Sequence, residues 1–157
     1  MNWTIEERDW DDPAGVDLRN AQRIELDERY GCDDHEPGTA PSAADIDVFL
    51  VASSAAGHPI GCGALRRLDD TSAEVKRMYV TPASRGSGVA AAILRALEEQ
   101  ARDRGWTTLR LETGTSQPDA IRFYDREGYR QFPRYGAYVD SAISVCYERA
   151  LESVSPA

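Results

Sequence analysis

A glycine-rich hexapeptide, Arg85-Gly86-Ser87-Gly88-Val89-Ala90, constrains the fold of this chain more than any other segment. It follows an apolar run that ends at Val80 and precedes an amphipathic stretch, so it predicts a turn between a strand and a helix. The first N–H groups of a helix lack intrahelical acceptors, and the helix dipole makes this end positive. Glycines let the backbone approach a ligand closely, and Arg85 can add charged donors. We therefore expect this segment to bind phosphate oxygens.

Two other interpretations of the hexapeptide are open. The first is a turn that caps the helix and binds nothing. The second is a dinucleotide-binding loop, because Gly86, Gly88 and Ala91 fit the G-x-G-x-x-A spacing and Glu112 follows where a ribose-binding acid would lie. However, residues 81–85 separate the apolar run from Gly86, and the chain lacks the repeated strand and helix alternation of a doubly wound sheet. The spacing therefore disfavours a dinucleotide fold.

Length and charge limit the class of protein. The chain has 157 residues, 41% of them hydrophobic, and no Pro/Gly/Ser linker divides it, so we expect a single domain over residues 1–157. The formal net charge of -9 is opposite to that of a general nucleic-acid binder, so no nucleic acid is expected as a partner. An acidic surface favours cationic small substrates, and it equally serves solubility.

Membrane and metal partners are not expected either. No apolar run approaches the roughly 18 residues that cross a bilayer, and residues 1–7 lack the features of a signal peptide, so the chain is expected to be cytoplasmic. Cys62 and Cys146 lie in strand-like runs, which predicts buried, reduced thiols. Cys32 and His35 have the spacing of two metal ligands, but no second pair completes a site.

Hydrophobic periodicity predicts the order of the elements. A strand over residues 2–7 precedes a helix that is capped by Asp12, begins at Pro13 and ends near Tyr30 before Gly31. An antiparallel meander follows, with strands at residues 47–53, 59–66 and 73–80. The remaining elements are a helix over 89–104, a strand over 107–113, a helix over 119–127 and a strand over 143–151. This order predicts a mixed α/β fold with helices on both faces of a central sheet.

The helix over residues 89–104 is expected to bury one face. Its apolar stripe contains Ile93, Leu94, Leu97 and Ala101. The residues expected to face water are Arg95, Glu98, Glu99 and Arg102.

Three segments follow one another in a characteristic order: residues 74–80, the loop 85–90 and residues 120–129. The loop has the spacing Arg-x-x-Gly-x-Ala, and the last segment contains Phe123-Tyr124 and then Gly128-Tyr129. In this order the chain resembles the GNAT superfamily, the acyl-CoA-dependent N-acetyltransferases, over residues 60–151. The resemblance implies the GNAT fold. That fold is a twisted, mostly antiparallel sheet of six to seven strands, with a splayed parallel pair and helices on both faces.

The resemblance also implies acetyl-CoA as the co-substrate. The strand before the glycine loop would pair its backbone with the pantetheine arm, and the loop would hold the pyrophosphate. Gln117 stands where many family members carry an asparagine that contacts the cofactor, and its amide offers the same groups from a longer arm. The implied cofactor-binding residues are Met78, Tyr79, Val80, Arg85, Gly86, Ser87, Gly88, Val89, Ala90, Gln117 and Tyr124.

Two residues match positions that family members use for proton transfer. Only a neutral amine attacks a thioester, and an alkylamine is mostly protonated at pH 7, so the reaction needs a base. Glu74 matches the position of that general base, and a salt bridge to Lys76 or another cation is its alternative role. Tyr124 matches the general acid that protonates the departing thiolate, and core packing is its alternative role.

Candidate residues for binding the acceptor substrate are aromatic and polar, and they lie in segments that resemble the loops around the GNAT substrate cleft. The candidate substrate residues are Tyr30, His35, Tyr135 and Tyr138. The implied function is transfer of the acetyl group of acetyl-CoA to a primary amine of a small molecule, by direct attack in a ternary complex. A protein lysine or N-terminal acetyltransferase and a catalytically silent acyl-CoA-binding module are the alternatives. A homodimer is compatible with all three.

Overall fold

The computed structural model describes residues 2–32 and 37–151. The strands in this part of the chain are β1 Trp3–Glu7, β2 Val48–Ser54, β3 Pro59–Arg67, β4 Ser72–Val80, β5 Thr108–Gly114, β6 Arg130–Phe132 and β7 Ser144–Ala150. The helices are α1 Pro13–Tyr30, α2 Val89–Asp103 and α3 Pro118–Arg126, with 3-10 turns at Pro82–Ser84 and Gly136–Tyr138. Every predicted helix and strand is confirmed to within two residues. The short strand β6 was not predicted, because three residues are too few to show an alternating pattern.

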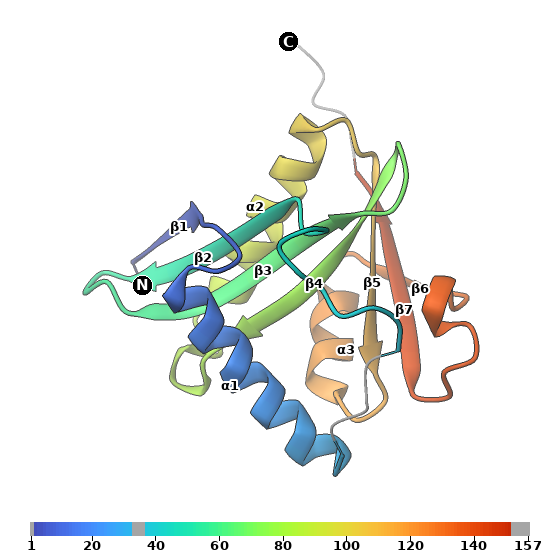
Figure 1. The fold of residues 1–157 in the computed structure, drawn as a ribbon, viewed down its shortest axis with the longest axis horizontal. Coiled ribbons are helices and arrows are strands. Elements are labelled where there is room, and N and C mark those ends of the chain that lie inside the picture. Colours follow the sequence, from blue (N-terminus) through green and yellow to red (C-terminus); the bar gives the residue numbers. More distant parts are fainter. Residues whose placement is uncertain (1, 33–36, 152–157) are drawn as a thin grey trace.

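All the strands belong to one sheet in the order β1-β2-β3-β4-β5-β7-β6. Neighbouring strands are antiparallel, except that β4 and β5 are parallel. This order confirms the predicted mixed α/β fold and is incompatible with the doubly wound parallel sheet of a dinucleotide-binding domain. Figure 1 shows α1 crossing one side of the sheet, with α2 behind it.

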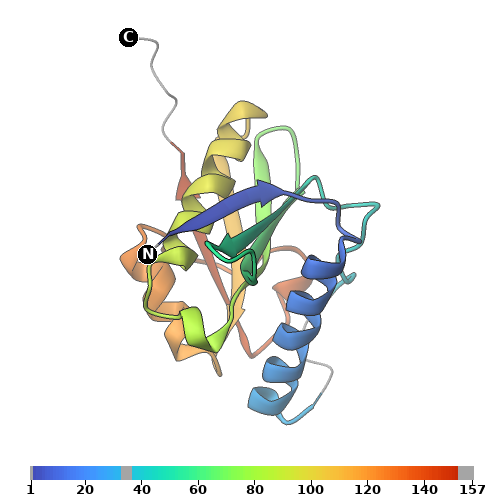
Figure 2. The same ribbon diagram turned by 90° about the vertical axis from the view of Figure 1, so that its left-hand side faces the viewer.

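Hydrophobic residues on both faces of the sheet form two core clusters. The larger cluster lies under α2 and α3 and contains the predicted stripe of Ile93, Leu94, Leu97 and Ala101. The smaller cluster lies under α1 and joins Leu18 to residues of β2, β3 and β4. Figure 2 shows α1 and α2 on opposite sides of the strands, which confirms that helices cover both faces.

The cysteines behave as expected in the strands. Cys62 and Cys146 are buried and unpaired, whereas Cys32 is exposed. Burial raises the pKa of the Cys62 thiol to about 12. This cysteine therefore remains a neutral thiol at physiological pH.

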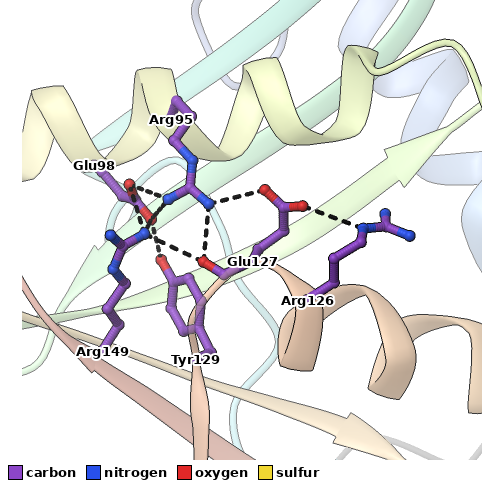
Figure 3. Close-up of polar contacts among 6 residues, drawn as sticks. All are labelled: Arg95, Glu98, Arg126, Glu127, Tyr129 and Arg149. Atoms are coloured by element: carbon purple, nitrogen blue, oxygen red, sulfur yellow. Dashed lines mark hydrogen bonds and ion pairs between the residues drawn. The ribbon is translucent and has the colours of Figure 1, made fainter.

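Glu98 corrects the expectation that this side of α2 faces water. Its side chain is only 1% exposed, and its carboxylate accepts hydrogen bonds from Arg95, Tyr129 and Arg149 (Figure 3). Arg95 also donates to the backbone carbonyl and the side chain of Glu127 at the end of α3, at 2.8 Å each. A carboxylate fits this interior because three donors compensate for its lost hydration. The helical period alone could not show this, because the partners come from distant segments.

We predict that Glu98→Ala lowers the free energy of unfolding by about 3 kcal/mol, since it leaves charged and polar donors unpaired at a buried position. Urea denaturation at neutral pH measures this loss. Glu99→Ala is the matched control, because Glu99 is the exposed next residue of the same helix and should change stability little. Equal effects of the two substitutions would contradict the structural role of Glu98.

Candidate active site

The sheet splits between its two parallel strands. β4 and β5 pair only from Ser72 to Glu74, which lie opposite Thr108 to Arg110. Beyond this point β5 continues to pair with β7, while the rest of β4 leaves β5, and the C-terminal ends of the two strands point apart in Figure 1. The cleft that opens at the split is lined by Gln22, Leu26, Tyr30, Val75, Lys76, Arg77, Met78, Glu112, Thr113, Gln117, Ala120 and Tyr124.

A β-bulge shapes the β4 wall of this cleft. The register with β3 slips by one residue between the pairs Ala64–Lys76 and Cys62–Tyr79. Arg77 lies at the bulge with a φ of 56°, and the Cys62 thiol donates to its carbonyl oxygen at 3.3 Å. The extra residue reverses the alternation of side chains, so Met78 packs toward α2 and Tyr79 toward α1.

The predicted glycine loop lies at one end of the cleft wall and opens α2. Gly86 and Gly88 have φ values of 79° and 95°, a conformation that favours glycine. The first helical bond runs from the Ala92 amide to the Gly88 carbonyl at 3.1 Å, so the amides before Ala92 have no acceptor within the helix. The Val89 amide donates to the Ser87 hydroxyl at 3.4 Å. A Cβ at Gly86 would meet nothing within 4 Å, which leaves the loop open to a ligand. The loop geometry therefore fits a pyrophosphate group.

The Arg85 side chain does not extend freely toward the expected phosphate site but contacts other parts of the protein. Its Nη2 pairs with the Glu25 carboxylate of α1 at 2.9 Å, and its Nε donates to the Val80 carbonyl at 3.0 Å. Arg85 thus joins the end of β4 to α1. A contact with a phosphate remains a prediction for this residue.

Helix α1 reaches both walls of the cleft. The Gln22 amide donates to the Met78 carbonyl on β4 at 2.9 Å. At the end of α1, Tyr30 accepts a hydrogen bond from the amide of Gln117 at 3.3 Å. Tyr30 lies so close to Gly114 of β5 that a Cβ there would be 1.5 Å from its hydroxyl oxygen. The structure therefore brings Tyr30 and Gln117 together, whereas nothing in the sequence pattern indicated Gln22.

Tyr124 lines the cleft from α3. Its side chain is only 6% exposed, and its ring packs against Phe123, Tyr129 and Tyr147. Among the described residues its hydroxyl has no hydrogen-bond partner, and burial raises its pKa. Tyr124 therefore keeps its proton at neutral pH, as the predicted acid requires, and it also packs in the core.

Glu74 lies on β4 next to the split and is enclosed by donors. Arg66 donates to Oε1 at 3.0 Å, and the hydroxyls of Tyr135 and Tyr138 donate to Oε2 at 2.7 Å each. Burial acts to raise the pKa of this carboxyl, but the charge of Lys76 and these hydrogen bonds outweigh burial and lower the pKa. Glu74 is thus an ionised carboxylate. The salt-bridge role is present too, with Arg66 as the partner.

Tyr135 and Tyr138, two of the candidate substrate-binding residues, are thus hydrogen-bonded to Glu74, the candidate base. Tyr138 also accepts a hydrogen bond from the Lys76 ammonium at 3.1 Å, so it links Lys76 to Glu74. Burial and the neighbouring Glu74 carboxylate raise the pKa of Tyr135. Lys76 follows Glu74 by two residues on the same side of β4, so strand alternation could have identified it.

Three further expectations concern His35, metal binding and membrane spans. His35 lies outside the described residues, so its predicted contact with the substrate stays a prediction. Within residues 2–32 and 37–151, no group of three or more histidine, cysteine or acidic residues is arranged to hold a metal ion. No helix in the same ranges is long and apolar enough to cross a membrane.

A split parallel pair, a bulged strand beside it and a glycine loop at a helix N-terminus together define an acetyltransferase-type fold. Residues 8–129 match the model of the Acetyltransferase (GNAT) family. The chain belongs to this family, as the resemblance of its motifs indicated.

Individual relatives agree with this assignment. The chain is 32% identical over 109 residues to the IAA acetyltransferase of Azospirillum brasilense, a match that covers 69% of this chain and 71% of the relative. A Klebsiella pneumoniae protein assigned as an acyl-CoA N-acyltransferase has a TM-score of 0.82 and 31% identity, covering 96% of this chain and 98% of that one. A GNAT acetyltransferase from Elizabethkingia anophelis, solved with acetyl-CoA bound, has a TM-score of 0.71 and 19% identity, covering 96% and 99%.

We predict that the stabilising effect of Glu74 depends on pH. Because its pKa is lowered in the folded protein, its ionised form stabilises the fold above its ordinary pKa of 4.5, and this contribution is lost as the pH falls through the lowered value. The difference in unfolding free energy between wild type and Glu74→Gln should therefore be largest near pH 7 and shrink below pH 4.5. Urea denaturation across this pH range measures it, with Glu99→Gln as an exposed control. A difference that is constant with pH would contradict the assignment of charge.

Proposed function

We propose that this protein transfers the acetyl group of acetyl-CoA to a primary amine of a small molecule, by direct attack in a ternary complex. The observation that supports the proposal most strongly is the split between β4 and β5. The split opens a cleft between β5 and the part of β4 that leads to the glycine loop, and Glu74 lies in the last pair before the strands part. Family membership supports acyl-CoA-dependent N-acetyl transfer in general.

The cofactor side of the cleft offers mainly backbone groups. The first amides of α2 and the loop glycines would hold the pyrophosphate, and the edge of β4 beyond Glu74 would pair with an extended pantetheine arm. Gln117 lines the same cleft and would contact the arm through its amide. The fit rests on this open edge and on the positive φ values of the loop glycines.

The acceptor side offers side chains that handle protons. As the amine nitrogen bonds to the acetyl carbon and the carbon–sulfur bond breaks, the amine loses a proton and the thiolate gains one. Both oxygens of Glu74 already accept hydrogen bonds, so the amine proton would reach Glu74 through the hydroxyl of Tyr135 or Tyr138, or through a water molecule. Tyr124, which keeps its proton, would protonate the thiolate.

A small amine suits this arrangement better than a protein segment. Tyr138 is 3% exposed and covers Glu74, while the end of α1 covers the cleft from the other direction through Tyr30. An extended peptide would have to displace these contacts. Acetylation of a protein and acyl-CoA binding without catalysis are the outcomes that the experiments below distinguish.

We predict that Gly88→Val weakens acetyl-CoA binding by at least about 10-fold, because a β-branched side chain at this positive φ disturbs the amides that would hold the pyrophosphate. Calorimetry and thermal shift with acetyl-CoA measure the effect, because a ligand of the native state raises its stability. Gly105→Val is the matched control, since Gly105 has a φ of 82° at the opposite end of α2. Stabilisation by NAD but not by acetyl-CoA would contradict the proposed cofactor.

We predict that Tyr124→Phe slows acetyl transfer by about 10- to 1,000-fold, with little change in acetyl-CoA affinity, because only the proton donor is lost. Thiol release over a panel of primary amines measures turnover. Tyr147→Phe is the control, since this neighbouring tyrosine is also buried and packs against Tyr124. Acetyl-CoA binding without turnover of any amine would indicate a silent binding module, and turnover of peptides alone would indicate a protein acetyltransferase.

A further inference from the structure

We propose that Arg110 binds an anionic group of the acceptor, so that the substrate is a primary amine that also carries a carboxylate or a similar small acid. The proposal rests on the proposed acetyl transfer and specifies the acceptor class for the same site.

Arg110 lies at the place where the sheet splits. It is the β5 residue opposite Glu74 in the last pair before the strands part. Its neighbours Leu109 and Leu111 pack in the core under α2, so Arg110 and Glu112 lie on the opposite face of β5, the face of the Glu74 cluster. Glu112 is itself a wall of the cleft.

Within the described residues, no carboxylate oxygen lies within ion-pair distance of the Arg110 guanidinium. Its Nε is fully buried and makes no hydrogen bond. Two acidic residues lie opposite Arg110 in the register, Glu74 on β4 and Glu148 on β7, and neither forms an ion pair with it. Glu74 already accepts hydrogen bonds from Arg66, Tyr135 and Tyr138. The residue as a whole is only partly buried, so other donors of its guanidinium can reach a ligand. A charged donor that lacks an acceptor is costly, and an anionic ligand would supply one.

Aromatic rings hold this guanidinium in place. Its central carbon lies 5.5 Å from the centre of the Phe132 ring and 6.0 Å from that of Tyr135, and these two rings stack on each other. Such contacts orient the planar group and leave its edge available for a bidentate contact.

The neighbouring charges suit a zwitterion. Glu112, two residues further along the same face of β5, lies about 7 Å from Arg110 along the strand. Its carboxylate accepts a hydrogen bond from Ser144 and lines the cleft, so it can attract the ammonium form of an arriving amine. When the acid group of the substrate binds Arg110, its amino group would lie in the cleft. This spacing fits short α-, β- and γ-amino acids.

The first test compares matched amines. Thiol release from acetyl-CoA is measured with the common α-amino acids, β-alanine, 4-aminobutyrate and 2-aminoethylphosphonate, against phenethylamine, propylamine and butylamine. We expect the best acid-bearing amine to exceed its matched neutral amine by at least about 10-fold in kcat/KM, the range of a charge-assisted hydrogen bond. Equal or better turnover of the neutral amines overturns the proposal while leaving acetyl transfer intact.

The second test uses variants of Arg110. Arg110→Gln should raise the KM for the acid-bearing amine by about 10- to 100-fold, with kcat changed much less, and should abolish the preference over the neutral amine. Arg110→Lys should restore part of the preference, because it keeps the charge without the planar fork. Arg104→Gln removes the same charge after the end of α2 and should behave as wild type. A merely structural Arg110 would alter kcat and KM for both kinds of amine alike, and that outcome overturns the proposal.

Calorimetry provides a readout that does not need turnover. The same amines are titrated into the protein saturated with coenzyme A. Binding of acid-bearing amines that Arg110→Gln abolishes supports the proposal even if no amine is acetylated, in which case the proposed catalysis fails. Absence of their binding overturns the inference. A preference for succinyl-CoA over acetyl-CoA that depends on Arg110 would place the anion on the acyl donor and also overturn it.

Discussion

The short parallel pairing of β4 with β5 is the constraint on which the rest of the structure depends. Only the segment from Ser72 to Glu74 joins the two strands, and beyond it the backbone of β4 has no neighbouring strand on this side within the described chain. Backbone groups in a protein interior need hydrogen-bond partners. The Gln22 side chain supplies one of them, at Met78, and an extended ligand would supply others. The split is therefore both an incomplete sheet and a binding surface.

Two buried carboxylates join the halves of the sheet that this split separates. On one face, Glu74 of β4 accepts hydrogen bonds from Tyr135 and Tyr138, which follow β6. On the other face, Glu98 of α2 accepts hydrogen bonds from Tyr129 and Arg149 of the far half. Each carboxylate has three protein donors, which makes its burial tolerable. The Glu98 cluster also fixes the end of α3 and hence the helix that carries Tyr124.

The sequence allowed the fold to be predicted well because local periodicity carries most of the information. The apolar stripe of α2, the cap of α1 at Asp12 and the turn at Gly31 are all properties of neighbouring residues, and all are confirmed. Glu98 was assigned to solvent because its partners are far away in the sequence. The same reason hid Arg110 and Gln22, whose importance depends on which strands and helices become neighbours.

The two sides of the cleft differ in how well they can be predicted from a sequence. On the cofactor side, the proposed binding relies on backbone groups, and backbone geometry depends on glycine spacing, so residues 85–90 indicate it directly. On the acceptor side, the groups are side chains from β4, β5 and the segment after β6, brought together only by the fold. A GNAT acetyltransferase with acetyl-CoA bound shares this fold at 19% identity. Similarity at this level shows the fold, so the acceptor has to be inferred from this chain's own charged side chains, in particular from Arg110.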